Sequence, residues 1–364
     1  MRPRDTVRMD TCASDEIYQD QILPHVSRTF ALTIPQLPPG LRSPVTNAYL
    51  LCRIADTIED QTAPSAAATL VLLQRFVAVV RGIADAAPLV EDLLAQLSPD
   101  TSPAERDLVR NTGCVVRFTA ALEERPRRAI RRCVELMCDG MHRFQQTAGL
   151  QGVPRAVDLD EYCYYVAGVV GEMLTELFCG YSAAIDRRSG ALREFAVSFA
   201  QGLQMTNILK DVWEDHSRGV CWLPQEVFTR HGIDLATLTP GPDARFDAGM
   251  RELIGVAHAH LRNALAYTLL IPRRETGIRR FCLWAVGLAV LTLRRIERTP
   301  GFTSGAQVKV SRSTVTTVTL LTGAAVRHDW VLRRLFDLAT AGLTVAPPSA
   351  VHVAQSAAPL DALP

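Results

Sequence analysis

The stretch Tyr49-Leu-Leu-Cys-Arg-Ile-Ala-Asp-Thr-Ile-Glu-Asp60 decides how this chain folds. Four of its polar residues recur at steps of four, three and four: Tyr49, Arg53, Asp56 and Asp60. Such steps place side chains on one face of a helix, while the apolar residues between them occupy the other faces. The stretch therefore predicts a helix whose polar face carries an aromatic ring, a cation and two anions.

A second acidic stretch, Asp211-Val-Trp-Glu-Asp215, follows about 150 residues later, with Asn207 one helical turn before it. In both stretches carboxylates recur at i, i+3 and i+4, and like charges in that arrangement repel one another. Divalent metal would relieve the repulsion, and Mg²⁺ typically uses one or two carboxylates per ion, with substrate phosphates completing its coordination. For either stretch alone, a solvated acidic surface is the alternative interpretation.

Apolar residues follow the helical period through most of the chain, as in residues 67–83, 129–144, 192–212 and 253–270. Strict alternation, which is typical of strands, is not sustained anywhere. The β-branched run at residues 308–318 has no evident partner strand, so we expect a loop that enters a helix. The sequence predicts an all-α fold.

Proline, glycine and serine cluster at residues 35–44, 98–103, 149–154 and 299–305. None of these clusters is long enough to link separate domains. We therefore expect a single domain at 14–344, preceded by a mobile tail at 1–13 and followed by a disordered tail at 345–364.

Composition excludes some classes of protein. The chain has 364 residues, 48% of them hydrophobic, so it can bury a sizeable core. Its formal net charge of +1 gives no general electrostatic reason to bind nucleic acid. The most apolar run, residues 281–293, is shorter than the roughly 20 residues that cross a bilayer, so no transmembrane segment is expected.

The cysteines point to a reducing compartment. Nine occur, without a C-x-x-C pair, and most lie in apolar runs, as buried thiols do. The N-terminus lacks the apolar core of a signal peptide. We expect a cytoplasmic protein.

Five segments together resemble the squalene and phytoene synthases, which join two isoprenyl diphosphates head to head. The resemblance covers roughly residues 20 to 330 and implies a many-helix bundle around a central cavity. Its specificity lies in the order and spacing of the segments: Ser27-Arg-Thr-Phe-Ala-Leu, Tyr49 to Asp60, Tyr162-Cys-Tyr-Tyr-Val-Ala-Gly-Val-Val-Gly171, Gln204 to Asp215, and Arg218-Gly-Val-Cys-Trp-Leu-Pro224.

The resemblance implies that Mg²⁺ bridges the substrate diphosphates to both acidic helices. The metal-binding residues expected on this basis are Asp56, Glu59, Asp60, Asn207, Asp211 and Asp215. The residues expected to take part in catalysis are Tyr165, Tyr49, Arg53, Asp56, Asp60, Asp211 and Asp215. The two tyrosines are candidates for stabilising cations with their ring faces or for assisting proton loss.

Substrate-binding residues implied by the resemblance include cations, polar side chains and two phenylalanines: Ser27, Arg28, Phe30, Arg53, Gln204, Asn207, Lys210, Arg218 and Phe281. Guanidinium groups suit diphosphate because each can bond two oxygens at once. For each arginine a surface ion pair is the alternative, and for each phenylalanine it is core packing. Lys210 departs from the family, which commonly has arginine at this position.

The glycines in the third segment have two interpretations. Ala167, Gly168 and Gly171 either leave room for an isoprenoid chain, with Tyr165 projecting into the cavity, or allow two helices to pack closely.

The C-terminal third resembles the squalene synthases more than other members of the family. An apolar segment, Phe281 to Leu293, precedes Val308-Lys-Val-Ser-Arg312, the basic segment that in those enzymes contributes to an NADPH site. Lys309 and Arg312 are three residues apart, so in a helical turn both would reach one phosphate. A solvent-exposed basic turn is the alternative.

The expected reaction therefore joins two farnesyl diphosphates through presqualene diphosphate and reduces the product with NADPH to squalene, with Mg²⁺ and NADPH as cofactors. The alternatives are a phytoene, dehydrosqualene or hydroxysqualene synthase that does not use NADPH, or a non-catalytic helical scaffold that binds isoprenoids. A peripheral membrane contact stays open, because the expected product is insoluble in water.

Overall fold

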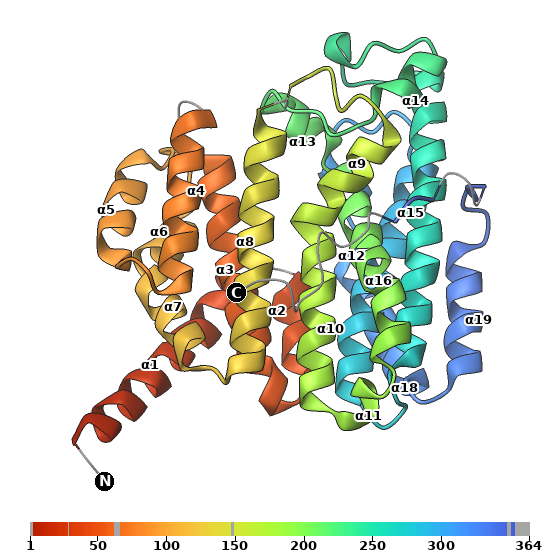
Figure 1. The fold of residues 1–364 in the computed structure, drawn as a ribbon. Coiled ribbons are helices and arrows are strands. Elements are labelled where there is room, and N and C mark those ends of the chain that lie inside the picture. Colours follow the sequence, from red (N-terminus) through yellow and green to blue (C-terminus); the bar gives the residue numbers. More distant parts are fainter. Residues whose placement is uncertain (1–2, 28, 62–65, 147–148, 348–350, 354–364) are drawn as a thin grey trace. The chain divides into compact units, whose positions relative to one another are not determined.

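The computed structural model describes residues 3–27, 29–61, 66–146, 149–347 and 351–353 (Figure 1). These residues form helices and connecting loops, and no β-strand occurs among them. An isolated β-bridge pairs Val153 with Pro224. The all-α prediction is confirmed.

The chain divides into two compact units. The N-terminal unit contains Met1–Gln146 and Met173–Arg187, and the C-terminal unit contains Thr147–Glu172 and Arg188–Pro364. The expectation of a single domain at 14–344 stays a prediction.

The N-terminal unit is built around α3, which packs against α1, α7 and α8. Residues on the inner side of α3, such as Leu50, Leu51 and Ile54, are fully buried. The helices of this unit are α1 (Pro3–Val26), α2 (Thr29–Thr33), the short 3₁₀ helix η1 (Ile34–Gln36), α3 (Pro39–Gln61), α4 (Ala66–Arg81), α5 (Ala86–Gln96), α6 (Pro103–Arg110), α7 (Thr112–Ala121), α8 (Glu124–Gln145), most of α10 (Val169–Tyr181) and α11 (Ala183–Asp186).

In the C-terminal unit the long helices α12, α15 and α16 pack side by side (Figure 1). The unit also includes the first turn of α10. Its other helices are α9 (Ala156–Cys163), the π-helix η2 (Tyr164–Gly168), α12 (Ser189–Lys210), α13 (Val212–Ser217), α14 (Gln225–Arg230), the 3₁₀ helix η3 (Leu235–Thr237), α15 (Ala244–Leu270), α16 (Thr276–Arg298), α17 (Gly305–Val308), α18 (Arg312–Ala325) and α19 (Asp329–Thr340).

The β-branched run at 308–318 behaves as the sequence predicts. Helix α17 ends at Val308, an extended segment follows, and α18 begins at Arg312. The Ser311 hydroxyl accepts a hydrogen bond from the Thr314 N–H, 3.2 Å away, and so caps the new helix. Local capping thus overrides the strand propensity of the valines and threonines.

The two expected tails differ in the structure. Helix α1 begins at Pro3, so residues 3–13 of the expected N-terminal tail are helical. At the other end, Glu297 accepts hydrogen bonds from the N–H and hydroxyl of Thr344, at 3.2 and 2.7 Å. Most of 345–364 lies outside the described residues.

Within the described part of the chain, α16 is long and apolar enough to cross a membrane by length and composition. It contains the apolar run 281–293, extended at both ends to 23 residues with a mean hydropathy of 1.4 in its most apolar window. Since 61% of that window is buried inside the protein, α16 has the environment of a core helix.

Candidate active site

The polar face expected on α3 is the face that the N-terminal unit leaves accessible. Tyr49, Arg53 and Asp56 are half-buried and Asp60 is exposed, whereas the α3 residues between Arg53 and Asp60, apart from Asp56 and Glu59, are buried. The aliphatic side chains of this stretch therefore lie in the core, and its aromatic, cationic and anionic groups lie on the accessible face, as the helical period predicts.

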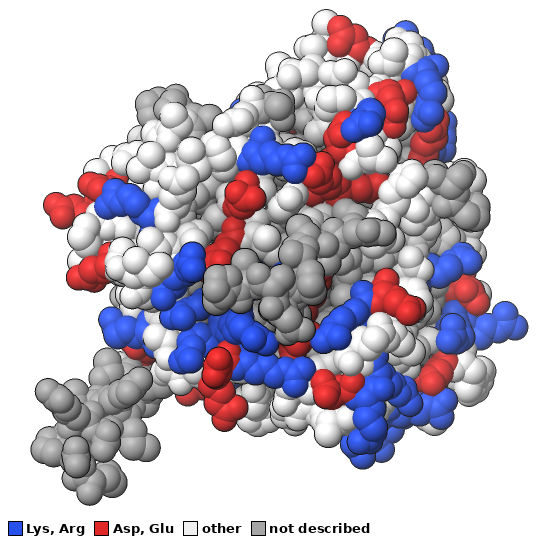
Figure 2. Space-filling view, viewed as in Figure 1, with Lys and Arg blue, Asp and Glu red and all other residues white. Residues whose placement is uncertain are grey.

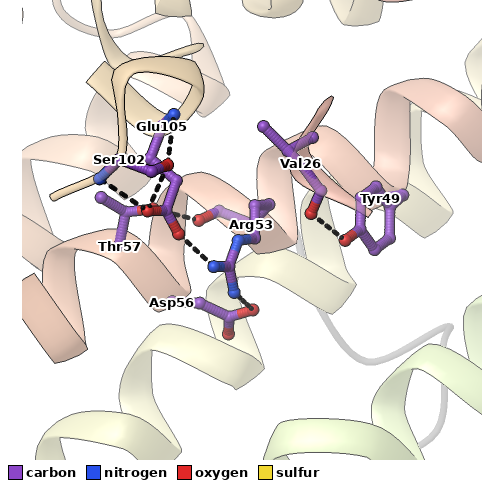
Figure 3. Close-up of polar contacts among 7 residues, drawn as sticks. All are labelled: Val26, Tyr49, Arg53, Asp56, Thr57, Ser102 and Glu105. Carbon is purple, nitrogen blue, oxygen red and sulfur yellow. Dashed lines mark hydrogen bonds and ion pairs between the residues drawn. The ribbon is translucent and has the colours of Figure 1, made fainter. Parts of the chain in front are cut away.

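Arg53 lies between two carboxylates (Figure 3). Its guanidinium donates a short hydrogen bond to Glu105, and it lies 3.8 Å from the carboxylate of Asp56. Both interactions fix the direction of Arg53 on the accessible face. A guanidinium held in this way is oriented before any anionic ligand arrives.

Glu105 is a site residue that the sequence analysis missed. It belongs to a capping box at the start of α6, where it accepts from the Ser102 N–H at 3.2 Å and from its hydroxyl at 2.8 Å. Although burial alone would raise the pKa of Glu105, hydrogen bonds from Ser102 and the charge of Arg53 lower it overall. The signal was present as Ser102-Pro-Ala-Glu105, a typical helix start.

Asp56 is the most perturbed carboxyl group on this face. Burial raises its pKa to about 7, and the neighbouring Asp60 and Glu105 carboxylates add to the effect, although Arg53 opposes it. The Asp56 side chain is nevertheless 39% exposed. The surrounding protein atoms therefore remove part of its hydration, but solvent and ligands can still reach the carboxylate. A carboxyl group in this state would gain from a cation, which favours its charged form.

Glu59 and Asp60 complete the first acidic stretch but differ in environment. Asp60 is exposed, whereas Glu59 is half-buried, and its backbone carbonyl accepts a hydrogen bond from Gln145 Nε2 at 3.1 Å. The structure brings Asp56 and Asp60 to the accessible face and leaves Glu59 closer to α8.

The residues predicted near Tyr49 form a small group. The Tyr49 hydroxyl donates to the Val26 carbonyl at 3.0 Å, and its ring lies 5.1 Å from that of Phe30 between centroids. Burial raises the pKa of Tyr49. Ser27 caps α2 by accepting from the Phe30 N–H at 3.0 Å, while Arg28 lies outside the described residues.

The second acidic stretch lies in the C-terminal unit, and it is not one straight helix. Helix α12 ends at Lys210 and α13 begins at Val212, with Asp211 between them at φ −97° and ψ 12°. The backbone bonds from Asp211 N–H to Asn207 and from Asp215 N–H to Asp211, at 2.8 and 2.9 Å, continue the helical pattern across the break. The expected single helical stripe is therefore bent at Asp211.

Two cations hold the carboxylates of this stretch. The ammonium of Lys210 pairs with both oxygens of Asp211, and Arg218 pairs with Asp215 at 2.5 Å. The Asp211 side chain remains 37% exposed, whereas that of Asp215 is 10% exposed. Asp211 is thus the accessible carboxylate, and Asp215 orients Arg218.

Asn207 is exposed and Gln204 is half-buried, one turn apart on α12. The structure places both on the helix that leads into Asp211.

Helix α17 packs against the second acidic stretch, which the sequence did not predict. The Gly305 N–H donates to Glu214 at 2.9 Å, and a Cβ added at Gly305 would lie 3.1 Å from Asp211 Oδ1. Lys309 follows α17 directly and is exposed. The helix that directly precedes the basic segment therefore packs against the second acidic stretch in the same unit.

Lys309 and Arg312 do not share a helical turn. Lys309 is extended, with φ −68° and ψ 136°, and Arg312 is the first residue of α18. The expectation that a helical turn aims both at one phosphate is wrong in its geometry, because Ser311 ends the extended segment by capping α18.

The glycines of the third segment serve helix packing. A Cβ at Gly171 would lie 2.1 Å from the Ala196 carbonyl oxygen, and one at Gly168 would lie 3.1 Å from Val197 Cγ1, both in α12. Close packing is therefore the better interpretation of both glycines. The local π-helix at Tyr164–Gly168 presents Tyr165, which is half-buried and lies edge-on to Tyr164 at 5.3 Å. Such π-helical turns are frequent at functional sites.

Phe281 is 2% exposed and lies among the core residues of α16. Its environment favours the core-packing alternative.

The donor atoms suit a metal that the substrate helps to bind. Within the described residues, no three His, Cys, Asp or Glu side chains converge as a preformed metal site. Asp56, Asp60 and Asp211 nevertheless offer accessible carboxylate oxygens, the hard ligands that Mg²⁺ prefers. Because Mg²⁺ is often held by one or two carboxylates plus substrate phosphates, these residues fit that ion.

Charges of both signs lie next to one another on the surface drawn in Figure 2. This agrees with a formal net charge of +1.

Comparisons with known proteins agree with one another. The family model for squalene/phytoene synthase matches residues 23–314. Squalene synthase R6 of Phoma sp. is 30% identical over 296 residues, covering 79% of this chain and 66% of that protein. Squalene synthase BSS of Botryococcus braunii is 31% identical over 307 residues, covering 81% of this chain and 62% of that protein. The chain thus spans just under two thirds of the length of these relatives.

Solved structures show the same fold. The complex of TcSQS with the ligand BPH1237 matches with a TM-score of 0.74 at 23% identity and covers 91% of both chains. A dehydrosqualene synthase in complex with a ligand matches with a TM-score of 0.62 at 21% identity, covering 88% of this chain and 99% of that one. At these identities the likeness concerns the fold alone.

Proposed function

Because the chain belongs to the squalene/phytoene synthase family, we propose that it joins two farnesyl diphosphates to presqualene diphosphate and reduces this with NADPH to squalene. The curated relatives reported above are both named squalene synthases and match about four fifths of the chain. This supports squalene over the other products of the family.

The observation that carries the proposal is the accessible face of α3. Asp56 and Asp60 expose carboxylates there, and Arg53 is oriented beside them by Glu105. Carboxylates alone would repel a diphosphate, so the face suits a diphosphate only together with cations. Mg²⁺ would supply that charge and stabilise the diphosphate as it leaves.

The roles of the chain's own residues follow from their environments. Asp56, with a pKa of about 7, is partly protonated at neutral pH and becomes a full anion when cations and substrate occupy the face. Arg53 and Arg218 donate to diphosphate oxygens from directions set by Glu105 and Asp215. Asp211 presents the accessible carboxylate of the second stretch.

Tyr49 acts through its ring rather than its hydroxyl. The hydroxyl already donates to the Val26 carbonyl, and burial raises the Tyr49 pKa, so proton loss from this group is disfavoured. The ring pairs with Phe30 and offers an electron-rich face to a cationic intermediate. Tyr165, from the π-helix, is the second candidate for that role.

For NADPH we propose Lys309 and Arg312 as separate contacts rather than as one phosphate clamp. Both are exposed, and the Gly305 to Glu214 hydrogen bond holds α17, which directly precedes Lys309, against the second acidic stretch. A dinucleotide carries several phosphates, so two cations on an extended segment suit it.

Product analysis tests the proposal. Purified protein is incubated with farnesyl diphosphate and Mg²⁺, with and without NADPH, and the extracted products are separated. We expect squalene with NADPH, and presqualene diphosphate or unreduced products without it. Dehydrosqualene, phytoene or hydroxysqualene as the main product in the presence of NADPH would contradict the proposal, and no conversion at all would favour an isoprenoid-binding scaffold.

We also propose a cytoplasmic location. The side chains of eight of the nine cysteines are described; all eight are free, and seven of them are buried. Thiol titration of denatured protein, purified without reductant, should find every cysteine reduced. A disulfide would count against a reducing compartment.

A further inference from the structure

Helix α18 has a surface that is unusual for a protein exposed to water. No charged residue occurs from Ser313 to Val326, although most of α18 is exposed or half-buried. Leu320 and Leu321 are 68% and 50% exposed, in the second half of the helix. Trp330, in the first turn of α19, is 72% exposed. These three residues are here called the α18–α19 apolar patch.

The patch is compact along the chain. Leu320 lies about 8 Å from the end of α18 at 1.5 Å per residue, and a short turn then leads directly into α19 and Trp330. Helices α18 and α19 also pack against each other, so these exposed apolar groups lie on neighbouring elements. Grouped apolar residues mark an interaction surface more often than scattered ones do.

The threonines of α18 make the helix less polar than its composition suggests. Their hydroxyls donate to carbonyls one turn back in the same helix: Thr316 to Arg312 at 3.1 Å, Thr317 to Ser313 at 3.0 Å, and Thr322 to Val318 at 2.7 Å. A hydroxyl bonded in this way does not need water, and the side chain then presents its methyl group. Transfer of such a helix out of water therefore costs little free energy, because these hydroxyl groups keep their hydrogen bonds.

Arginines flank the patch. Arg327, Arg333 and Arg334 are exposed and make no ion pair with any carboxylate in the described part of the chain. The nearest acidic residue in sequence, Asp329, is instead neutralised by Arg273 and Arg279, at 2.7 and 2.5 Å. Asp337 is the exposed acid on α19. The local charge is therefore positive where α18 meets α19.

We infer that α18 and the first turn of α19 dock on an anionic lipid surface, with Leu320, Leu321 and Trp330 in the headgroup layer. Tryptophan is favoured at that depth because its ring is apolar and its N–H is polar. Arginines beside it attract acidic headgroups. At 14 residues α18 would reach only about 21 Å, short of the roughly 30 Å apolar core, so it lies on the bilayer rather than crossing it.

A second copy of the chain suits the patch less well. Its three side chains offer on the order of 400 Å² of apolar surface, below the roughly 800 Å² that each partner commonly buries in a stable complex. The unpaired arginines would also repel one another across a twofold interface.

The test uses the full chain and vesicles of phosphatidylcholine with or without phosphatidylglycerol. Trp330 is the reporter, because Trp213 and Trp284 are only 5% and 9% exposed and Trp222 is stacked on Tyr162. We expect its fluorescence to shift to the blue with the anionic vesicles, and the shift to weaken as salt is added.

Two variants separate the apolar and ionic contributions. The double variant Leu320→Ser with Leu321→Ser should bind anionic vesicles at least tenfold more weakly. Arg327→Gln with Arg333→Gln should weaken binding about fivefold per arginine on anionic vesicles and leave binding to phosphatidylcholine unchanged. The matched control, Val71→Ser with Ile83→Ser, removes apolar side chains that are 52% and 71% exposed in the N-terminal unit, and should bind as the parent does.

The inference is overturned if the parent chain ignores anionic vesicles, or if the control weakens binding as much as the leucine variant does. It is also overturned if sedimentation shows a dimer that the leucine variant abolishes while vesicles cause no blue shift. Because vesicle binding is measured without substrate, none of these results depends on the proposed reaction.

Discussion

Asp160 is a carboxyl group with an unfavourable environment in the C-terminal unit. It is 4% exposed, and burial raises its pKa to about 7. In the unfolded chain the same group ionises near pH 3.8. The folded state therefore holds a proton that the unfolded state has lost between these pH values, and stability falls as pH rises through that window.

Replacing Asp160 by asparagine should remove this cost. At pH 8 we expect Asp160→Asn to raise the free energy of unfolding by up to about 3–4 kcal/mol, and at pH 4 to change it little. Urea unfolding at both pH values measures the difference. Asp158→Asn is the matched control, because Asp158 is paired with Arg155 at 2.8 Å and its loss should destabilise the protein at pH 8. Equal effects of Asp160→Asn at the two pH values would show that the pKa of Asp160 is not raised in the folded protein.

At the residue level the sequence predicted which groups are accessible better than what they contact. The steps between Tyr49, Arg53 and Asp56 were enough to predict their shared face. The Glu105 contact joins residues 52 positions apart, and helical periodicity carries no information about such pairs. A capping box marks where a helix begins, and tertiary packing decides which side chain its glutamate meets.

At the level of elements, the contact between α10 and α12 depends on one missing side chain. A Cβ at Gly171 would lie 2.1 Å from the Ala196 carbonyl oxygen and 3.2 Å from the Ala200 Cβ. Backbone cannot yield as a flexible side chain can, so any larger residue must push the helices apart.

Gly171→Ala should therefore destabilise the protein by about 1–3 kcal/mol, despite the better helix propensity of alanine. Gly190→Ala, in the first turn of α12, is the control, because nothing lies within 4 Å of its added Cβ. That variant should be neutral or more stable by up to about 1 kcal/mol. Thermal unfolding of both variants gives the comparison, and similar midpoints would show that α10 and α12 can separate at little cost.

The break between α12 and α13 shows what periodicity cannot predict. The carboxylates of the second stretch have helical spacing, yet Asp211 departs from helical φ and ψ. Nothing in the sequence of this stretch marks the break, since it contains neither glycine nor proline. The packing of α17 against Lys210, Asp211 and Glu214 is a tertiary contact that only the structure provides.

For the whole molecule, the sequence predicted the helical class, the family and the principal polar faces, because these depend on local period and on motifs in a fixed order. It did not predict the division into two units, which meet at three points in the chain, one of them inside α10. A continuous helical pattern hides such a boundary. The sequence also did not predict which residues near the ends pack against the fold, because this depends on individual tertiary contacts.

Thr344 ties the chain after α19 to α15 and α16. Its carbonyl lies 3.1 Å from His258 Nδ1, and Glu297 accepts from both its N–H and its hydroxyl. A chain ending at Pro347 keeps these bonds, whereas one ending at Leu343 loses them and leaves the buried His258 without that partner.

We expect the chain ending at Leu343 to lose about 2–4 kcal/mol of stability and the chain ending at Pro347 to unfold as the parent does. Thermal unfolding of the two truncations, which differ by four residues, measures this. Equal midpoints would mean that the Thr344 contacts contribute nothing.

Because the chain has few lysines, amine chemistry can be directed at a single side chain. Lys210 and Lys309 are the two lysines of the chain, and the ammonium of Lys210 is paired with Asp211 while that of Lys309 is exposed. Apart from the α-amino group, an amine-acylating reagent should therefore modify one position first. Mass spectrometry of that single adduct would report whether a bound nucleotide shields Lys309, without any engineered label or measurement of turnover.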